Sequence, residues 1–451
     1  MREALKVGIS GVRGVVGQSF TPQLASSFAQ AFGMYAGTGP VVVGRDTRTS
    51  GPMVEEAVVA GLLSVGCRPV LCGVLPTPSI LFAVKHLGAN GGIAITASHN
   101  EAPWNALKFA GRNGLFLSPS DADELFDIYH QQDFPLVPEG EIRRTERLDN
   151  AILPHLKCVL NYMKPEGIRK RRFPVAVDCC NGAGAHYSLP FLRDDLGCEV
   201  TAIHDSPSGR FERPPEPLPG HLERLSETVR RTGCVVGFAQ DPDGDRLAIV
   251  DETGTPIGED LTLVLCAQQV LSAHARGPLV VNQSASKAVD YVAGEFGVEV
   301  IRAKTGEIHV SSKMLEVGSV VGGESSGGVI VPAIHPCRDS FTAMALVLEL
   351  LAAKGKPVSE LCAALPSFVV MKKKFTIEPT QAPRILRAVR RHFDSERLEL
   401  MDGVYVDFGD RWVHVRRSNT EPVVRLMAEA PTREQTEALV RDVEGVIREA
   451  M

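Results

Sequence analysis

The chain has 451 residues, a formal net charge of −6, 44% hydrophobic residues and 23% charged residues. This length predicts about three or four domains, and the composition excludes a disordered or fibrous chain. The negative balance argues against nucleic-acid or membrane binding. No apolar run reaches the ~18 residues of a membrane span, and the first residues lack a signal-peptide core. We therefore expect a cytoplasmic protein with ten reduced cysteines.

Short apolar strands alternate with helical patterns from residue 41 onward. The first unit has predicted strands at 41–46, 69–72 and 92–96 and predicted helices at 52–65 and 78–87. A second unit has predicted strands at 175–178, 198–203, 234–239 and 247–250. A third has helices at 259–272, 287–296, 308–316 and 340–353 around strands at 279–281, 298–301 and 319–321. This alternation is typical of α/β layered domains.

The last segment has a different order of elements. Predicted strands at 369–375, 404–408, 412–416 and 423–428 are grouped between helices at 381–393 and 433–449. Grouped strands indicate a small α+β domain. We therefore predict domains at 1–150, 151–253, 254–366 and 367–451, the first three being α/β units of one kind.

The N-terminal glycine segment, Gly8–Gly14, has three glycines in its seven residues. Such a segment lets a backbone approach a ligand, and Arg13 within it could bind an anion. A flexible turn is the alternative interpretation.

The serine loop, Thr96–Asn100, follows the predicted strand at 92–96. Ligands bind at the carboxyl ends of strands in α/β sheets. Ser98 could be a nucleophile or a phosphate carrier, and His99 and Lys108 could handle protons or charge. The G-x-S-x-G pattern of α/β hydrolases is absent, and a polar turn or helix cap is the alternative.

The aspartate loop, Asp241–Arg246, places carboxylates at Asp241, Asp243 and Asp245 between apolar strands. Three such charges repel one another without a cation, and hard oxygen ligands suit Mg²⁺. An EF-hand does not fit, because Arg246 stands where that loop requires glycine. A solvated acidic turn remains the alternative.

Two further loops carry polar groups. The glutamate loop, Gly322–Gly328, is rich in small residues, and its Glu324 and Ser326 can bond the vicinal hydroxyls of a sugar. The anion loop, Arg416–Pro422 with Arg425 beyond it, gathers donors that suit a phosphate dianion. A flexible linker and a polar hairpin turn are the respective alternatives.

Together and in this order, these five segments resemble the α-D-phosphohexomutase family, which includes phosphoglucomutases, phosphomannomutases and phosphoglucosamine mutases. The resemblance runs from Gly8 to Arg425. It implies four domains around a central cleft, three of one α/β type and a smaller fourth. It also implies transfer of a phosphoryl group between C1 and C6 of a hexose or hexosamine through phosphorylated Ser98 and a bisphosphorylated sugar.

The resemblance further implies roles for single residues. Ser98 and the three aspartates would hold Mg²⁺, with Arg13, His99 and Lys108 around the reacting centre and Arg246 in the cleft. Glu324, Ser326 and Gly327 would contact the sugar. The non-reacting phosphate would be bound by Arg416, Ser418, Asn419, Thr420 and Arg425. Expected small-molecule partners are a sugar phosphate and hexose 1,6-bisphosphate as activator, for a monomer or a homodimer.

Some positions depart from the family pattern. Glu101 replaces a usual proline, Ala106 a usual glycine, and Gly328 a histidine found in many relatives. His335 could supply the missing imidazole, with an ordinary loop histidine as the alternative.

The favoured substrate is glucosamine phosphate, ahead of mannose and glucose phosphates. A non-catalytic sugar-phosphate sensor and a metal-dependent phosphatase using Ser98 are the competing functions.

Overall fold

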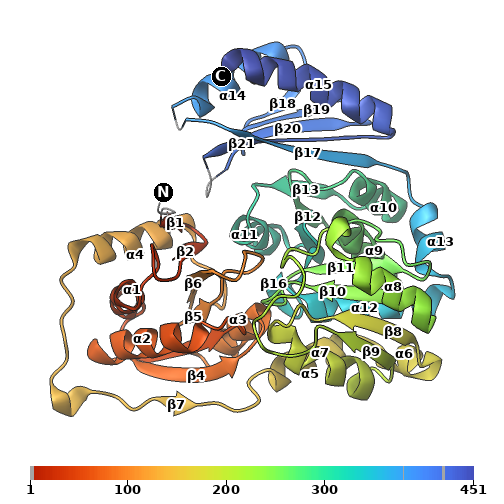
Figure 1. Cartoon of the computed structure of the whole chain (residues 1–451). Helices are drawn as coiled ribbons and strands as arrows, with labels where there is room; N and C mark the ends of the chain where they lie inside the picture. Colours follow the sequence, from red (N-terminus) through yellow and green to blue (C-terminus); the bar gives the residue numbers. More distant parts are fainter. Residues whose placement is uncertain (1–4, 379, 419–421) are drawn as a thin grey trace.

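The computed structural model describes residues 5–378, 380–418 and 422–451, and its four sheets follow one another along the chain (Figure 1). Each sheet falls within one of the four predicted segments. Three segments combine strands with helices in α/β layers, and the fourth is a smaller α+β unit. The predicted fold class is confirmed, while the boundary residues stay a prediction.

The first segment holds a seven-stranded sheet with the order β1-β2-β6-β5-β3-β4-β7. Its elements are β1 (Lys6–Gly8), β2 (Gly11–Val15), α1 (Pro22–Ala36), β3 (Pro40–Arg45), α2 (Gly51–Ser64), β4 (Arg68–Val74), α3 (Thr77–His86), β5 (Gly91–Ile95), β6 (Trp104–Gly111), α4 (Pro119–Gln131) and β7 (Glu146–Arg147). β3 lies parallel to β4 and β5, whereas β6 lies antiparallel to β5 and β2.

The N-terminal glycine segment forms a β-hairpin and not a flexible turn. β1 and β2 pair antiparallel, and β2 continues onto β6 with Arg13 opposite Ala106. At the hairpin, Gly11 has φ +104°, and a Cβ atom there would lie 2.0 Å from the carbonyl oxygen of Leu107. Only glycine fits so close to a neighbouring strand. The pairing fixes Arg13 on a sheet.

The second and third segments each centre on parallel strands with an antiparallel extension. The second has the order β11-β10-β8-β9, and the third has the order β13-β12-β14-β15-β16. The second comprises α5 (Leu153–Tyr162), α6 (Pro165–Arg171), β8 (Pro174–Asp178), α7 (Ser188–Pro190), β9 (Glu199–Ile203), α8 (Glu223–Thr232), β10 (Val236–Gln240) and β11 (Leu247–Asp251). The third comprises α9 (Glu259–Ala273), β12 (Leu279–Asn282), α10 (Ala288–Phe296), β13 (Val300–Ala303), α11 (Glu307–Val317), β14 (Val321–Glu324), β15 (Gly328–Val331), β16 (His335–Arg338), α12 (Ser340–Lys354) and α13 (Val358–Ala363).

Helix α12 lies at the centre of the largest hydrophobic core. Its residues 340–351 are buried, as expected for a helix that is apolar on all sides. They share one core with residues such as Ile80 of α3, Leu156 of α5 and Val175 of β8. The single charge in this stretch, Glu349, accepts hydrogen bonds from His274 Nε2 at 2.5 Å and the Lys164 amide at 3.0 Å. The helix therefore belongs to a core to which each of the first three segments contributes, while the first segment also has a core of its own.

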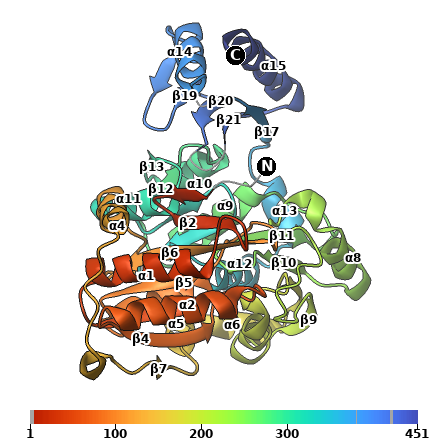
Figure 2. The same cartoon turned by 60° about the vertical axis from the view of Figure 1, so that its left-hand side comes forward.

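The fourth segment has its own core and stands apart from the other sheets in two views (Figures 1 and 2). Its antiparallel sheet has the order β17-β21-β20-β19-β18, covered by two helices on the outer face. The elements are β17 (Val369–Thr376), α14 (Ala382–His392), β18 (Arg397–Glu399), β19 (Val404–Asp407), β20 (Trp412–Arg417), β21 (Val423–Ala430) and α15 (Arg433–Ala450). Polar contacts join it to the third segment, including Ser284 Oγ to His414 Nδ1 at 2.8 Å and Lys287 Nζ to Asp407 at 2.8 Å.

Candidate active site

The serine loop follows β5 and places Ser98 in an uncommon backbone conformation. Ser98 has φ +49° and is 3% exposed. Its amide donates to Thr96 Oγ1 at 2.9 Å, and Thr96 Oγ1 donates to Asp46 Oδ2 at 2.6 Å. Its hydroxyl donates to Asp241 Oδ2 at 2.9 Å. The tertiary structure thus directs the Ser98 hydroxyl at the aspartate loop, whereas the Thr96 hydroxyl is directed at Asp46.

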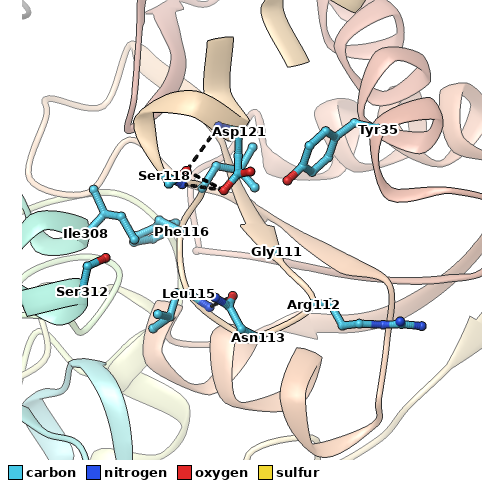
Figure 3. A pocket seen from close by; sticks show the side chains of 11 residues that line it. Tyr35, Gly111, Arg112, Asn113, Leu115, Phe116, Ser118, Asp121, Ile308 and Ser312 are labelled. Atoms are coloured by element: carbon cyan, nitrogen blue, oxygen red, sulfur yellow. Dashed lines mark hydrogen bonds between the residues drawn. The ribbon is translucent and has the colours of Figure 1, made fainter. Parts of the chain in front are cut away.

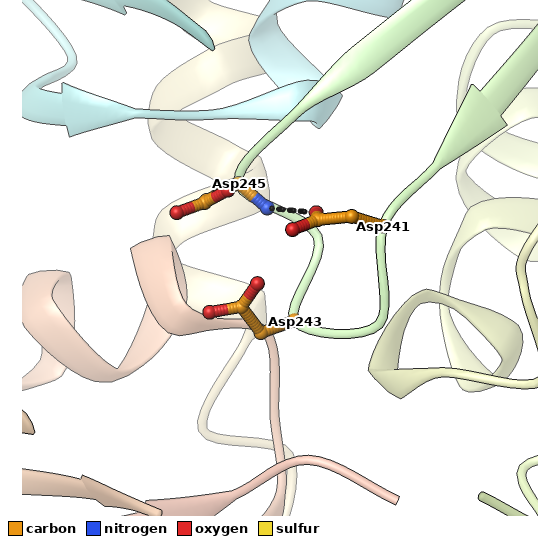
Figure 4. A group of neighbouring side chains, drawn as sticks. All are labelled: Asp241, Asp243 and Asp245. Carbon is orange, nitrogen blue, oxygen red and sulfur yellow. Dashed lines mark hydrogen bonds between the residues drawn. The ribbon is translucent and has the colours of Figure 1, made fainter. Parts of the chain in front are cut away.

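The aspartate loop connects β10 to β11 and turns at Gly244, where φ is +68°. One carboxylate oxygen of each of Asp241, Asp243 and Asp245 lies within 4.8 Å of the others, and all three residues are fully buried. Figure 4 shows the three carboxylates converging from one turn. The amides of Asp245 and Arg246 donate to Asp241 Oδ1 at 3.2 and 3.1 Å. The loop therefore folds around its own first carboxylate.

The aspartate cluster suits a divalent cation. Asp243 Oδ1 and Asp245 Oδ1 are buried and accept no hydrogen bond among the described residues. Such orphaned oxygens are costly unless something binds them. Carboxylate oxygens that surround a small space are the ligand type that Mg²⁺ uses.

The carboxyl groups of Asp241 and Asp243 have pKa values shifted in opposite directions. Burial and the charges of Asp245 and Asp243 raise the pKa of Asp241 well above its usual range. Burial also acts to raise the pKa of Asp243, but the Lys108 ammonium and the hydrogen bonds from Asp241, Lys108 and Thr77 outweigh it and lower that pKa. Three like charges at this distance cannot all ionise without compensation. A divalent cation would supply that compensation.

Two strand residues bring positive charge to the centre. Lys108 projects from β6, and its Nζ donates to Asp243 Oδ2 at 2.8 Å, where Thr77 Oγ1 also donates at 2.8 Å. Arg13 projects from β2, and its Nη1 donates to Asn100 Oδ1 at 2.8 Å. The structure thus brings Arg13, Lys108 and Ser98 together, as predicted from sequence. The small Ala106 lies between them on β6 and leaves the Lys108 contact intact.

His99 and Arg246 also lie in this group. Burial, followed by the positive charges of Arg246 and Arg13, lowers the pKa of His99 well below its ordinary value. Its buried Nδ1 has no hydrogen-bond partner within the part of the chain that the structure describes. Arg246 Nη1 contacts Glu216 Oε1 at 3.2 Å. The site therefore contains a neutral imidazole beside fixed cations.

The glutamate loop is partly strand, because Gly322, Gly323 and Glu324 belong to β14. Glu324 Oε1 accepts the Gly306 amide at 2.7 Å, and its Oε2 accepts Arg338 Nη1 at 2.8 Å. The turn packs on β11, where the Leu247 amide donates to the Gly327 carbonyl at 3.0 Å. Gly327 has φ +79°, and a Cβ atom there would lie 2.4 Å from Leu247 O. Ser326 is half-buried in this turn.

The anion loop follows β20 in the fourth segment. Arg416 lies opposite Arg425 of β21, and burial, then Arg425, lowers the pKa of Arg416, while Asp402 and Glu324 oppose that shift. Asp402, 3.9 Å from Arg416 Nε, also accepts the Thr305 amide at 3.2 Å, so this loop lies beside the third segment. Ser418 is buried, and its amide donates to Val423 O at 2.9 Å. Asn419 and Thr420 lie outside the described residues.

His335 does not join the site, and its proposed role as a replacement imidazole is corrected. It begins β16, opposite Val331, whereas Arg338 ends that strand on the side of the cluster. Its ring packs on Phe82, its Nε2 lies 2.9 Å from Gly114 O, and burial lowers its pKa to about 4. It is a buried contact between the first and third segments.

Sequence reasoning missed four residues that organise the site: Arg48, Thr77, Glu307 and Arg338. Arg48 bonds the backbone of the serine loop, and Arg338 bonds Asp245, Glu307 and Glu324. The sequence offered a signal for two of them, because charged residues directly follow β3 and end β16. A charged residue next to a buried apolar strand needs a hydrogen-bonding or oppositely charged partner, because an unpaired buried charge is costly.

A pocket elsewhere has a volume of about 320 Å³ and contains none of the predicted site residues. It lies between the β6–α4 connection and α11, with Arg112, Asp121 and Ser312 in its lining (Figure 3). Nothing in it converges as the aspartate cluster does.

The comparisons with known proteins agree with this geometry. Models described as phosphoglucomutase/phosphomannomutase α/β/α domains I, II and III match residues 4–136, 154–254 and 258–368, and the C-terminal domain model matches 369–446. These matches and the four-domain fold define the chain as a phosphohexomutase, an intramolecular phosphotransferase.

The chain belongs to the phosphoglucomutase/phosphomannomutase family. A protein of Methanopyrus kandleri named "Probable phosphoglucosamine mutase" is 37% identical over 98% of this chain and 97% of its own length. A "Phosphoglucomutase/phosphomannomutase" of Thermococcus kodakarensis is 37% identical over 95% of each. The crystal structure of a phosphoglucomutase/phosphomannomutase family protein from Burkholderia thailandensis has a TM-score of 0.85 at 26% identity, over 99% of this chain and 97% of that one. Across the described ranges, no helix is long and apolar enough to cross a membrane.

Proposed function

We propose that this enzyme interconverts the 1-phosphate and 6-phosphate of a hexosamine, with glucosamine phosphate as the favoured substrate. The main support for this proposal is the position of the Ser98 hydroxyl, which lies 2.9 Å from Asp241 in a buried carboxylate cluster. Lys108 donates a hydrogen bond to the same cluster. Relatives named phosphoglucosamine mutase support the amino sugar. The Thermococcus relative named phosphoglucomutase/phosphomannomutase supports glucose and mannose phosphates as the second candidates.

Ser98 is the group that would carry phosphate between turnovers. In the forward step, the bond from phosphorus to Ser98 Oγ breaks and a bond from phosphorus to a sugar hydroxyl oxygen forms. The sugar bisphosphate then turns over and returns its other phosphoryl group to Ser98. Enzymes make such transfers fast by positioning and by neutralising charge, and Lys108, Arg13 and Arg246 supply fixed cations here.

Mg²⁺, when bound by Asp241, Asp243, Asp245 and the phosphoryl group on Ser98, would neutralise negative charge on the transferring group. The orphaned oxygens of Asp243 and Asp245 support this assignment. Arg338 already engages Asp245 Oδ2, and Lys108 already engages Asp243 Oδ2. These two cations orient the carboxylates before any metal arrives.

The sugar hydroxyl must lose a proton as it accepts the phosphoryl group. We assign this proton to the His99 imidazole, which burial keeps neutral, and Lys108, held by Asp243, is the second candidate once it has given up its own proton. Glu324 and Ser326 would bond sugar hydroxyls in either orientation of the bisphosphate. Arg416 and Arg425, with Ser418 and the predicted Asn419 and Thr420, would hold the distal phosphate.

The test is phosphorus NMR of the purified protein with Mg²⁺ and a trace of hexose 1,6-bisphosphate. Glucosamine, glucose and mannose 1-phosphates are supplied in parallel. Preferred conversion of the amino sugar supports the proposal, and comparable turnover of glucose and mannose phosphates would replace the substrate while keeping the mechanism. Release of inorganic phosphate would favour a phosphatase. Binding without any conversion would favour a sensor.

A further inference from the structure

Arg338 occupies the space in which a side chain at position 328 would lie. A Cβ atom on Gly328 would be 2.2 Å from Cδ and 2.9 Å from Cγ of Arg338. The two residues belong to neighbouring antiparallel strands, β15 and β16. Because the head of Arg338 is fixed by three ion pairs, its stem has little freedom to move aside. The glycine at 328 and the arginine at 338 therefore depend on one another.

The guanidinium of Arg338 joins three carboxylates, one from the second segment and two from different elements of the third. Its Nη2 lies 2.5 Å from Asp245 Oδ2 in the aspartate loop, and its Nη1 lies 2.8 Å from Glu324 Oε2 in the glutamate loop. Its Nε lies 2.8 Å from Glu307 Oε2 at the start of α11. Each nitrogen has a different partner, whereas an ammonium would have to reach all three carboxylates from a single nitrogen atom.

These contacts fix the direction of two carboxylates. Both oxygens of Glu324 are engaged, one by Arg338 and the other by the Gly306 amide. Asp245 has Oδ2 on Arg338, whereas its Oδ1 accepts no hydrogen bond among the described residues and has only the Arg246 ion pair at 3.8 Å. Arginine stays protonated in proteins, so this orientation does not change when a proton is taken up or released nearby.

We propose that Arg338 is a positioning residue that couples the aspartate loop to the glutamate loop. It orients Glu324 toward the sugar and leaves Asp245 Oδ1 for a divalent cation. The part concerning Glu324 rests on the proposed function, whereas the part concerning Asp245 does not. This arrangement requires glycine at position 328, because a side chain there would occupy the space of the Arg338 side chain.

The decisive variant is Arg338→Lys, which keeps the positive charge and loses the fork. We expect kcat/KM for glucosamine phosphate to fall at least 30-fold, and Mn²⁺ affinity, measured by electron paramagnetic resonance, to weaken at least threefold. Arg302→Lys is the matched control, because Arg302 pairs with Asp290 in the same segment away from the cluster. It should stay within twofold of the unmodified protein in both measurements.

A second variant, Gly328→Ala, displaces the Arg338 side chain without changing any charge. It should lower kcat/KM and Mn²⁺ affinity in the same direction, and it carries the test if Arg338→Lys does not fold. Adding Glu324→Gln to Arg338→Lys should cost less than the product of the two single losses, because Arg338 acts through Glu324. Wild-type values in folded Arg338→Lys, or in Gly328→Ala, would overturn the proposal. If the unmodified protein converts no hexose phosphate, the proposed function fails, while the Mn²⁺ measurement still decides the role of Arg338.

Discussion

Two loops of the site are each held by one arginine, in chemically different ways. Arg48 is 1% exposed and directs all five N–H donors inward. Its acceptors are the carbonyl oxygens of Ser98, Asn100, Glu101 and Trp104 and the carboxylate of Asp46. Arg338 instead binds three carboxylates. The first arginine fixes the shape of a backbone, and the second fixes the direction of charges. Loss of the two should therefore affect different properties.

The Ser98→Ala variant should have the largest effect, because it removes the oxygen that we propose carries the phosphoryl group and keeps the loop that Arg48 holds. We expect turnover to fall by at least about 10⁴-fold, measured by phosphorus NMR. Stability should fall by only about 1 kcal/mol, since one hydrogen bond is lost. Ser120→Ala, at an exposed serine, is the control. Turnover above a hundredth of the normal rate would show that another group carries the phosphate.

The Arg48→Ala variant tests whether the serine loop depends on its arginine for shape. It leaves Asp46 as a buried charge without its ion pair and removes the arginine donors from four carbonyls, which should cost about 3–5 kcal/mol. Urea unfolding measures the loss. Arg45→Ala removes a partly exposed ion pair with Glu55 and should cost about 1 kcal/mol or less. Equal losses in the two variants would contradict a special role for Arg48.

Two buried histidines outside both loops predict that the folded protein becomes less stable in acid. Burial lowers the pKa of His335 and of His414 to about 4 in the folded protein, whereas the unfolded value is about 6.5. The unfolded chain therefore binds more protons between these values, and stability falls as the pH drops from 6.5 to 4. The loss is on the order of 3 kcal/mol per histidine. His335→Gln should flatten the stability curve in this range, and an unchanged slope would exclude His335 as its cause.

The stabilisation of the folded chain by Mg²⁺ should be the smallest of these effects. If it binds the oriented carboxylates, it stabilises the folded chain by about 2.7 kcal/mol at a hundred times its dissociation constant. Thermal unfolding with and without Mg²⁺ measures this shift. Asp245→Asn should reduce it, whereas Asp290→Asn, at an ion pair outside the cluster, should not. A shift that survives in Asp245→Asn would place the cation elsewhere.

The sequence predicted much of this site because its chemistry lies in short segments. The alternation of Asp241, Asp243 and Asp245 is visible without a structure, and so is Ser98 after an apolar strand. The alternation of strands and helices also follows from local periodicity. The bounds of most predicted strands agree with the observed bounds within two residues. Polar residues on strands were harder to predict from the sequence. Arg13 and Lys108 belong to β2 and β6, and the glycines and mixed polarity of these strands obscure the strand pattern.

Sequence by itself determined the fold class, the order of the loops and the candidates for the reacting groups, because apolar periodicity and chemical type are local properties. Tertiary structure decided which groups meet. His335 lies three residues from Arg338, yet the strand places it at the far end of β16 against Gly114. Arg338 reaches Asp245 across 93 positions and Glu307 across 31. Contacts of this range depend on the packing of whole segments, and no local pattern in the chain encodes them.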